Sequence, residues 1–582
     1  LISVPRNSAT LELLEALPVL IEGGDQERLH VEAKVDEIQT LQEWGIDVRI
    51  LVTDLQTLRP ISSSNAPLWL SPDSGEYHNE DQIILSLLEL GSAFPSISRV
   101  IQIGTSVEGR VIAGVLLSDK PWVREFDEPS FRIIGGQHGN EWASTEVTLA
   151  AAWHFAENYT TDPLVQGFLD SSELWIIPAL NPDGMSHFTR NNANNVDLNR
   201  NFSFAWRETA YSGNAPFSEP ETSAVRNLGM VRVFSHSLSV HSGAANLGWV
   251  WNHTTERCPD DDWMQGVSAR YLQATNHPDF WITNGADWYV IYGDTNDWSY
   301  GERGGQDYTL EVSEIKTPPE SSLDSLLGYH LVPIENFFVK DGVKGIRGRV
   351  RDQNGNGIEA TIRIVDETTF VYSDYETGAY HRPLPQGNYL LEVASHGFDT
   401  RLEEVIVEET GQTILDFELR ASVVAQNDVS ITGREQLANS AGTVSICGVA
   451  GVDMSWAIYR ASIGLFNMGE LTRDGDCWKG HWDPEVIVHP WEREGEWSIF
   501  VVNSQQEVIA RSSAGLVIVK SIGNPRWGLR LESAGFLPEF VSVESEVGLK
   551  RIVLSGDSVP LGASLRLIHT DGYRSVPIFQ SI

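Results

Sequence analysis

The spacing of apolar residues changes along this 582-residue chain, and the changes divide it into regions. Between residue 77 and about residue 338, apolar positions three and four apart alternate with short continuous apolar runs, which predict helices and buried strands. Because strands that alternate with long helices build layers, we expect an α/β domain with a mixed sheet flanked by helices. The predicted strands are Arg99–Ile103, Val111–Leu117, Phe131–Ile134 and Glu173–Ile177, and the predicted helices are Asn79–Ala93 and Trp142–Asn158.

The regions on either side follow other patterns. Ahead of the α/β domain, Gln39–Leu51 runs from a predicted helix into the apolar run Val48–Val52, which indicates a small α/β N-terminal domain, and the Ser- and Pro-rich stretch Ser62–Gly75 predicts a linker. Beyond residue 342, short strands alternate with turns that contain Gly, Asn and Pro, which predicts all-β sandwich domains. Those strands are Ile346–Val350, Thr361–Val365, Tyr389–Val393, Thr413–Leu419, Val444–Cys447 and Trp497–Val502.

Charge and hydropathy exclude several classes of function. The net charge is -39, which disfavours nucleic acid and anionic membrane surfaces because both need a basic footprint. No apolar run in the sequence reaches the ~18 residues that a membrane span needs. We therefore expect neither a nucleic-acid partner nor a membrane span.

The first residue of the chain and the three cysteines bear on the cellular compartment of the protein. The chain begins at Leu1 with no visible signal peptide, as either a processed secreted protein or a trimmed chain would. Cys447 and Cys477 share one β-rich segment, where they form either a disulfide or two buried thiols, and Cys258 has no evident partner. A disulfide fits an oxidising compartment, and we expect a secreted, periplasmic or extracellular protein.

A histidine and a glutamate three residues apart follow the predicted strand Phe131–Ile134. They are His138 and Glu141, and sites form at the carboxyl ends of strands in open α/β sheets. Both residue types bind zinc, and a catalytic zinc needs three protein ligands and one open position. The spacing alone is weak evidence, because His154 and Glu157 repeat it inside a predicted helix, where a partly solvated helix face explains it.

Further motifs follow in order along the chain. R-N-N-A-N-N-V-D-L-N-R-N-F runs from Arg190 to Phe202, S-V-H-S surrounds His241, and T-L-E-V-S begins at Thr309 ahead of a Pro pair. With the His–Glu pair, this set resembles the zinc carboxypeptidase family that includes the pancreatic digestive carboxypeptidases, and within it the N/E-type regulatory branch. One departure is Val312, where the branch has Leu. The resemblance covers roughly residues 77–420.

The resemblance implies a zinc-dependent metallocarboxypeptidase that hydrolyses the C-terminal peptide bond of peptides or proteins. One Zn²⁺ ion would be held by His138, Glu141 and His241. Glu311 matches the general base, and Arg190 matches the residue that stabilises the oxyanion of the tetrahedral intermediate.

Three more residues match the part of the family site that binds substrate. Asn199 and Arg200 match the clamp for the free carboxylate of the substrate, which a guanidinium binds with two hydrogen bonds. Tyr289 lies 22 residues before Glu311 and matches the mobile tyrosine that closes over substrate. Tyr300 is the competing candidate, in a setting that matches a structural segment.

Five domains follow from the patterns and the resemblance together. Residues 1–75 occupy the position of a pro-region, residues 76–338 form the catalytic domain, and residues 339–421 resemble a transthyretin-like β domain. Residues 422–520 predict a β-sandwich of unknown role, and residues 521–582 predict a β-rich C-terminal segment. The last two can bind an unknown partner or serve as spacers.

The predicted specificity pocket departs from the branch, which generally prefers C-terminal Arg or Lys. Asn252 stands where basic-specific relatives have Asp, and Asn296 stands where relatives have Gln, Asp or a hydrophobic residue. A buried ammonium that faces only amides would be poorly compensated. We therefore expect polar or neutral C-terminal residues to be favoured, unless an acid such as Asp287 or Asp294 reaches the pocket.

Two other functions compete with this interpretation. One is a peptidase that acts on cell-wall peptides, as some relatives do, and the other is a non-catalytic binding protein that keeps the fold. The intact clamp of Asn199 and Arg200 favours ordinary peptides, and the complete set of ligands and base favours an active enzyme.

Overall fold

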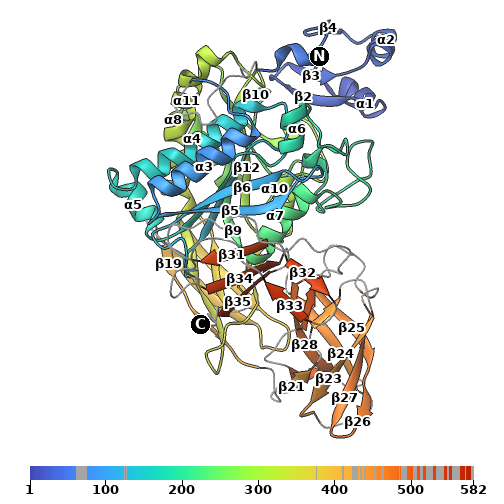
Figure 1. Cartoon of the computed structure of the whole chain (residues 1–582), viewed down its shortest axis with the longest axis vertical. Helices are drawn as coiled ribbons and strands as arrows, with labels where there is room; N and C mark the ends of the chain where they lie inside the picture. Colours follow the sequence, from blue (N-terminus) through green and yellow to red (C-terminus); the bar gives the residue numbers. More distant parts are fainter. Residues whose placement is uncertain are drawn as a thin grey trace.

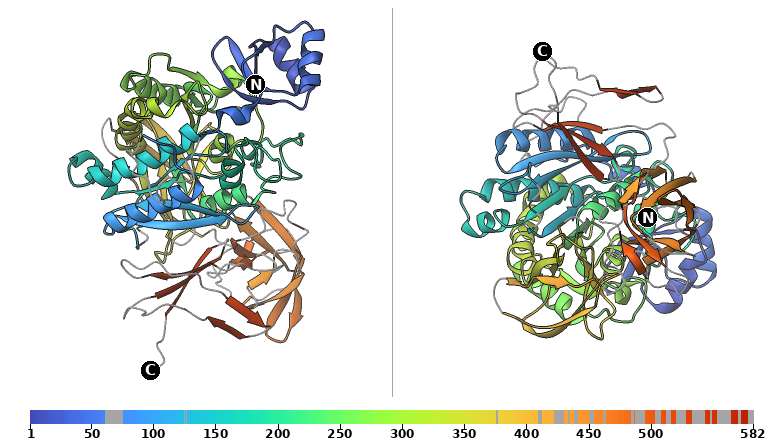
Figure 2. Two further views of the ribbon diagram at one scale, coloured as in Figure 1. Left: turned by 45° about the horizontal axis from the view of Figure 1, so that its top comes forward. Right: turned by 90° about the horizontal axis from the view of Figure 1, so that it is seen from below.

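The computed structural model describes residues 1–60, 75–123, 125, 127–374, 377–408 and 412–421, and beyond these the strands between residues 430 and 577 with some of their connections (Figure 1). The N-terminal residues lie at one end of the molecule, and the strands beyond residue 430 lie at the other (Figure 2). Among the helices of this described part, none has the length and apolar character that a bilayer crossing requires.

An eight-stranded mixed sheet forms the centre of the molecule. Its order is β11-β10-β12-β9-β7-β8-β6-β5, and β12, β9, β7 and β8 run parallel to one another in its middle. The parallel middle places the carboxyl ends of four strands at one edge. The strands are β5 (Ser98–Thr105), β6 (Val111–Leu117), β7 (Ser130–Ile134), β8 (Glu173–Ile177), β9 (Phe234–His241), β10 (Ala244–Trp249), β11 (Trp281–Asn284) and β12 (Gln306–Ser313).

Helices cover both faces of this sheet. Strand β7 shows why, since Ile133 packs into the core on one face and Ile134 into the core on the other, and both are buried. One face is covered by α3 (Glu80–Ala93), α4 (Trp142–Asn158), α5 (Pro163–Leu169), α8 (Asp261–Ala274) and α11 (Leu323–Asn336), and the other by α7 (Pro220–Val231) and α10 (Thr295–Gly301). The α/β architecture with a mixed sheet between helices is confirmed, as are the four predicted strands and both predicted helices, within a few residues at their ends.

A four-stranded antiparallel sheet with two helices forms the N-terminal unit. Its order is β2-β3-β1-β4. The helix predicted within Gln39–Leu51 begins earlier, because the capping interaction of Glu37 with the Lys34 backbone N–H starts it at Val35. The apolar run Val48–Val52 contributes only the two residues of β4, and most of the predicted linker lies outside the described residues. The elements are β1 (Ile2–Pro5), α1 (Ser8–Glu15), β2 (Leu20–Gly24), β3 (Arg28–Glu32), α2 (Val35–Glu43), β4 (Arg49–Ile50) and a 3₁₀ turn at Leu55–Leu58.

Two sheets that pack on each other follow the α/β region. Their orders are β16-β13-β19, with β20 also paired to β13, and β15-β14-β17-β18. The predicted strand Thr413–Leu419 is two strands, because the Asp416 carboxylate accepts the Arg349 N–H at 2.8 Å and interrupts the ladder. The strands are β13 (Gly345–Asp352), β14 (Thr361–Ile364), β15 (Phe370–Tyr372), β16 (Ala379–Arg382), β17 (Gly387–Ala394), β18 (Arg401–Val407), β19 (Gln412–Ile414) and β20 (Phe417–Leu419).

The remaining described segments are all β. One sheet has the order β21-β23-β27-β26, and Cys447 on β23 forms a disulfide with its register partner Cys477 on β27, so the disulfide alternative holds. Its strands are β21 (Ser430–Thr432), β23 (Gly442–Cys447), β26 (Thr472–Asp474) and β27 (Cys477–Trp482). A second sheet contains β22 (Glu435–Leu437), β24 (Ser455–Arg460), β25 (Gly464–Glu470), β28 (Gly495–Val502), β29 (Val508–Arg511) and β30 (Leu516–Val519). The last strands are β31 (Gly528–Glu532), β32 (Val543–Glu546), β33 (Leu549–Ile552), β34 (Ser564–His569) and β35 (Gly572–Pro577).

Candidate metal centre and catalytic pocket

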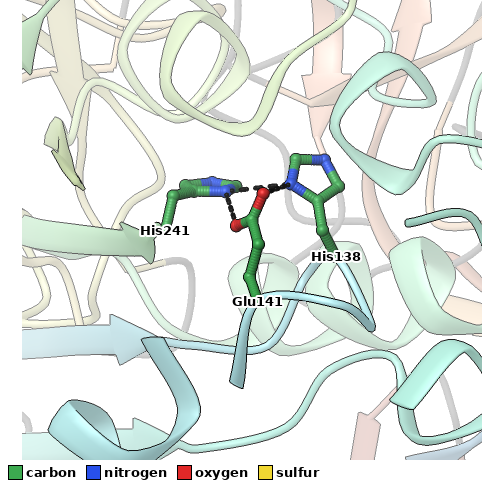
Figure 3. Close-up of side chains that lie close together, drawn as sticks. All are labelled: His138, Glu141 and His241. Atoms are coloured by element: carbon green, nitrogen blue, oxygen red, sulfur yellow. Dashed lines mark hydrogen bonds and ion pairs between the residues drawn. The ribbon is translucent and has the colours of Figure 1, made fainter. Parts of the chain in front are cut away.

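Three side chains that the sequence places far apart meet at the carboxyl edge of the central sheet. His138 lies in the turn after β7, Glu141 precedes the first residue of α4, and His241 is the last residue of β9. Since β7 and β9 are parallel neighbours, the two histidines emerge at the same edge. Figure 3 shows the Glu141 carboxylate between the two imidazole rings. All three residues are buried, and their ligand atoms lie within 4.8 Å of one another.

The donor set fits a tetrahedral zinc ion. The Nδ1 atoms of His138 and His241 are 3.2 Å apart, and the Glu141 oxygens lie 2.8 Å and 3.0 Å from them. Two ligands about 2.1 Å from a tetrahedral ion are separated by about 3.4 Å, so these spacings are close to those of ligands that surround one ion.

The second H-x-x-E pair has a different environment. His154 Nε2 contacts Glu335 Oε2 on α11 at 2.7 Å, and Glu157 is exposed. This pair ties two helices together and lies apart from the cluster at the strand ends. The interpretation of His154–Glu157 as a partly solvated helix face is therefore confirmed.

Asp197 joins the metal cluster to Arg190. Its Oδ1 contacts His138 Nε2 at 3.0 Å, and its Oδ2 accepts a hydrogen bond from Arg190 Nε at 3.0 Å. Burial acts to raise the pKa of Asp197, but the charges of Arg190 and His138 outweigh it and hold the pKa well below its usual range. The carboxylate is therefore a fixed negative charge that leaves His138 Nδ1 free to face the metal position.

Asn199 and Arg200 line the same cavity as the cluster. The Asn199 Oδ1 accepts hydrogen bonds from the Thr295 N–H at 3.0 Å, from the Thr295 hydroxyl at 3.2 Å and from Gln137 Nε2 at 3.3 Å. With its oxygen engaged on that side, the amide turns its Nδ2 toward the cavity. Asn199 and Arg200 thus present donors to one volume, which suits a carboxylate.

Glu311 lies next to His241 across the sheet, since the two residues are register partners on β12 and β9. Burial raises the pKa of Glu311 well above its usual range, and the nearby Glu141 charge adds to this. Its Oε2 has no hydrogen-bond partner among the described residues. Glu311 is therefore a buried carboxyl group with one oxygen available beside the metal position.

The two tyrosine candidates lie in different places. Tyr289 lines the cavity, and its ring packs against Trp288 at 4.8 Å and against the core of the N-terminal unit. Tyr300 is buried, and its hydroxyl donates to Asp260 at 2.8 Å, away from the cavity. The structure thus places Tyr289, and not Tyr300, beside the cluster.

The two predicted pocket residues lie near each other, since Asn252 Nδ2 is 3.5 Å from Asn296 Oδ1. Asn252 lines the cavity, whereas Asn296 lies behind and accepts a hydrogen bond from the lining residue Thr309 at 2.7 Å. Of the two acids that could supply a charge, Asp287 is exposed and pairs with Arg257 at 2.5 Å. Asp294 is fully buried and accepts a hydrogen bond from Asn252 Nδ2 at 2.7 Å.

The N-terminal unit covers the mouth of the cavity. Glu22 and Gly23 at the end of β2 are part of the cavity lining, and Glu22 is only 3% exposed. Its carboxylate pairs with Lys316, accepts a hydrogen bond from Asn140 at 3.1 Å and lies 3.8 Å from Arg190. The enclosed space is about 40 Å³, enough for water and too small for an amino-acid residue.

Two glycines allow this close approach. The Gly24 N–H donates to the carbonyl of Gly243, two residues after the metal-ligand candidate His241, at 2.9 Å. A Cβ on Gly23 would lie 2.3 Å from the Gly243 oxygen, and a Cβ on Gly243 would lie 2.4 Å from the Glu22 oxygen. Because both positions also have positive φ, any other residue would push the two backbones apart.

Three residues of the site were not expected from the sequence. Asp197 lies inside the Arg190–Phe202 motif, so that motif was the feature of the sequence that could have identified it. Lys316, which follows Glu311 by five residues, contacts Glu141 Oε1 at 2.9 Å. Burial acts to lower the pKa of Lys316, but the charges of Glu141 and Glu22 keep it raised. Glu22 gave no signal, because its partners are more than 100 residues away in sequence.

Comparisons with known proteins find two family models that match along the chain. Residues 84–328 match the family model described as zinc carboxypeptidase, and residues 345–420 match the model described as carboxypeptidase regulatory-like domain. Carboxypeptidase SOL1 of Arabidopsis thaliana is 31% identical over 351 residues, which cover 58% of this chain and 71% of that protein.

Two human relatives differ in how much of them the chain covers. The carboxypeptidase N catalytic chain of Homo sapiens is 28% identical over 404 residues, 61% of this chain and 88% of that protein. Carboxypeptidase D of Homo sapiens is 29% identical over 405 residues, and the match spans 64% of this chain but only 29% of that protein. Among solved structures, thrombin activatable fibrinolysis inhibitor aligns over 58% of this chain and 96% of its own, with a TM-score of 0.49 at 21% identity.

Proposed function

This chain belongs to the zinc carboxypeptidase family, and on that premise we propose that it releases single residues from the free C-termini of peptides or proteins. The observation that carries the proposal is the position of Asn199 and Arg200. Their donors line the same cavity as the His138–Glu141–His241 cluster, so a substrate carboxylate held there would lie beside the metal position.

His138, Glu141 and His241 would hold the zinc ion that the family implies. When bound, such an ion acidifies a water molecule and polarises the scissile carbonyl. Arg190 is held beside this position by Asp197 and by Glu141 Oε1 at 3.4 Å. We assign to its guanidinium the stabilisation of the oxyanion that forms as the carbonyl is attacked, because a fixed cation aimed at developing charge lowers the barrier.

Glu311 would act as the general base. Its available oxygen lies beside the metal position, where it would take a proton from the attacking water and deliver it to the leaving amine.

Three residues of the cavity lining would orient the substrate. The Nδ2 of Asn199 and the guanidinium of Arg200 would hold the terminal carboxylate, and Tyr289 would pack over it. The pocket that receives the C-terminal side chain contains the neutral amide of Asn252, which supports a preference for polar or neutral residues over basic ones.

Residues 1–75 would act as a pro-region that keeps this enzyme closed. Glu22 pairs with Lys316 inside the cavity, and the space that remains cannot hold a residue of substrate. Release of this unit would open the cavity. The Cys447–Cys477 disulfide supports a secreted or extracellular location, where thiols are oxidised.

A pair of matched peptides tests the proposal. One ends in a free carboxylate, the other has the same sequence with a C-terminal amide, and both are incubated with the zinc-loaded chain before and after proteolytic removal of the N-terminal unit. We expect release of the last residue only from the free acid. Equal cleavage of both peptides, or cleavage at internal bonds, would contradict the role of Asn199 and Arg200.

A further inference from the structure

Asn199 and Asn252 both line the cavity, but their side-chain amides are turned in opposite directions. The Asn199 oxygen is engaged on the side of Thr295, so its Nδ2 faces the cavity. For Asn252 the Nδ2 is engaged instead, since it donates to Asp294 Oδ1 at 2.7 Å. Because a carboxylate oxygen that already accepts other hydrogen bonds can only accept here too, the Asn252 amide is fixed with its oxygen on the other side.

The position of that oxygen is marked by Gly285, another residue of the lining. A Cβ on Gly285 would lie 1.5 Å from Asn252 Oδ1, so the oxygen occupies the space that a side chain at this position would take. Asn252 therefore presents an acceptor to the cavity, and only glycine at position 285 leaves room for it.

Asp294 is well placed to hold this orientation. It is fully buried as the N-cap of α10, and its Oδ1 also accepts the N–H groups of Asn296 at 3.0 Å and Asp297 at 3.1 Å. Burial raises the pKa of Asp294 to about 7, and the Asp297 charge adds to this. Since Oδ1 accepts three hydrogen bonds, a proton would go to Oδ2, which has no partner in the described part of the chain, and Asn252 would stay oriented.

The rest of this wall carries no formal charge. Asn246 lies on β10 beside Glu311, is buried, and its Nδ2 has no hydrogen-bond partner among the residues described. The pocket thus contains an available donor on Asn246 and an available acceptor on Asn252. The other lining residues on this side are Gly248, Thr283, Gly285 and Thr309.

The Asn246 donor and the Asn252 acceptor would discriminate between the C-terminal side chains of different substrates. An ammonium or guanidinium would face the Asn246 donor, and a carboxylate would face the Asn252 oxygen with Asp294 behind it. An alkyl side chain would leave both groups unpaired, which costs about 1–3 kcal/mol for each buried group. A carboxamide offers one acceptor and one donor, and so pairs with both.

We propose that Asp294 is a positioning residue that turns the Asn252 oxygen into the pocket, and that the pocket selects substrates whose C-terminal residue is Asn or Gln. This inference rests on the proposed carboxypeptidase activity and names its substrate class. Asp294 acts through Asn252 and does not contact substrate.

The test compares kcat/KM for peptides that differ only in a C-terminal Asn, Gln, Leu, Arg or Glu. The zinc-loaded full chain is assayed before and after proteolysis of the N-terminal unit. We expect Asn and Gln peptides to exceed each of the others by about tenfold or more. A faster Leu, Arg or Glu peptide would overturn the selectivity, whereas failure to release any C-terminal residue would sink the proposed function itself.

Two substitutions separate positioning from general structure. Asp294→Asn can donate as well as accept, so Asn252 would be free to turn, and the ratio of the Asn to the Leu peptide should fall about tenfold. Asp287→Asn removes an exposed acid near the same pocket and should leave that ratio as in wild type. An unchanged ratio in Asp294→Asn would overturn the positioning role.

A third variant keeps the inference testable where Asp294→Asn fails to fold. Asn252→Asp replaces the amide with a carboxylate, so the Asn peptide should lose its advantage and the Arg peptide should gain at least tenfold relative to it. Retention of the Asn preference in Asn252→Asp would show that the Asn252 amide does not select substrate.

Discussion

The cavity has a charged side and an amide side, and the two differ in how their polar groups are satisfied. On the charged side every cation touches a carboxylate, as Arg190 touches Asp197 and Lys316 touches Glu141. On the amide side, Asn246 Nδ2 has no hydrogen-bond partner among the described residues, and Asn252 Oδ1 faces the cavity beside Gly285. The charged side consists of His138, Glu141, Arg190, Asp197, His241, Glu311 and Lys316, and the amide side of Asn246, Asn252 and Thr309.

The sheet brings these sides together at adjacent positions. His241, Glu311 and Asn246 are register partners on β9, β12 and β10, so their side chains leave the same face of the sheet next to one another. One row of adjacent strand residues therefore contributes to both the charged side and the amide side of the cavity. On the proposed function, the compensated charges would perform the reaction, and the neutral groups would select the substrate.

The largest effect is expected at the centre of the charged side. Glu311→Gln keeps the shape but cannot accept a proton, so kcat should fall by about 10³-fold or more while zinc content stays at one ion per chain. Peptide hydrolysis and metal analysis of the same sample measure both. Glu320→Gln, an exposed acid nearby, is the control. Loss of zinc together with activity would mean that Glu311 maintains the metal site instead.

The two cavity asparagines should respond differently to the same change. Asn199→Asp places a negative charge where the substrate carboxylate binds, so kcat/KM should fall about 10²-fold for every peptide, whatever its last residue. Asn252→Asp should change the preference among peptides. Equal behaviour of the two variants across the peptide series would remove the distinction between the clamp and the pocket.

A third prediction concerns the N-terminal unit, which contributes Glu22 and Gly23 to the cavity lining. Glu22→Gln removes the charge that pairs with Lys316, which weakens the contact of the N-terminal unit, so the rate of the full chain should rise about tenfold. Glu12→Gln on the exposed face of α1 serves as the control. If Glu22→Gln left the rate of the full chain unchanged, the N-terminal unit would not be what limits access.

The smallest effect is expected at His330, whose side chain forms a hydrogen bond with β12. His330 is buried, donates from Nε2 to the Val312 carbonyl at 2.9 Å and accepts from the Tyr271 hydroxyl at 2.9 Å. Burial lowers its pKa to about 3, whereas an unfolded chain has about 6.5. The unfolded state therefore binds the proton first as pH falls below about 6.5, and stability is lost in that direction.

Unfolding by urea at two pH values tests this. Between pH 7.5 and 5.5 His330 should account for about 1 kcal/mol of lost unfolding free energy, and His330→Gln should lose less by that amount. The same pH dependence in both proteins would mean that His330 does not remain neutral in the fold.

The sequence predicted the charged side better than the amide side, for a physical reason. The continuous apolar runs of β7 and β8 indicate buried strands. The end of β7 then determines where His138 and Glu141 lie. The contact of Glu22 with Lys316 and of Asp294 with Asn252 depends on tertiary packing, which leaves no periodic signal. The division of Thr413–Leu419 into two strands likewise arises from one side chain, Asp416, that competes with the backbone for a hydrogen bond.

On the proposed function, the cavity is a zinc-dependent site for free C-termini. A mass-spectrometric time course of one unstructured peptide tests this, with the chain zinc-loaded, then chelated, then resupplied with zinc. We expect a ladder of products shortened one residue at a time from the C-terminus, which disappears on chelation and returns with zinc. Products of internal cleavage, or a ladder that persists without metal, would contradict the proposed function.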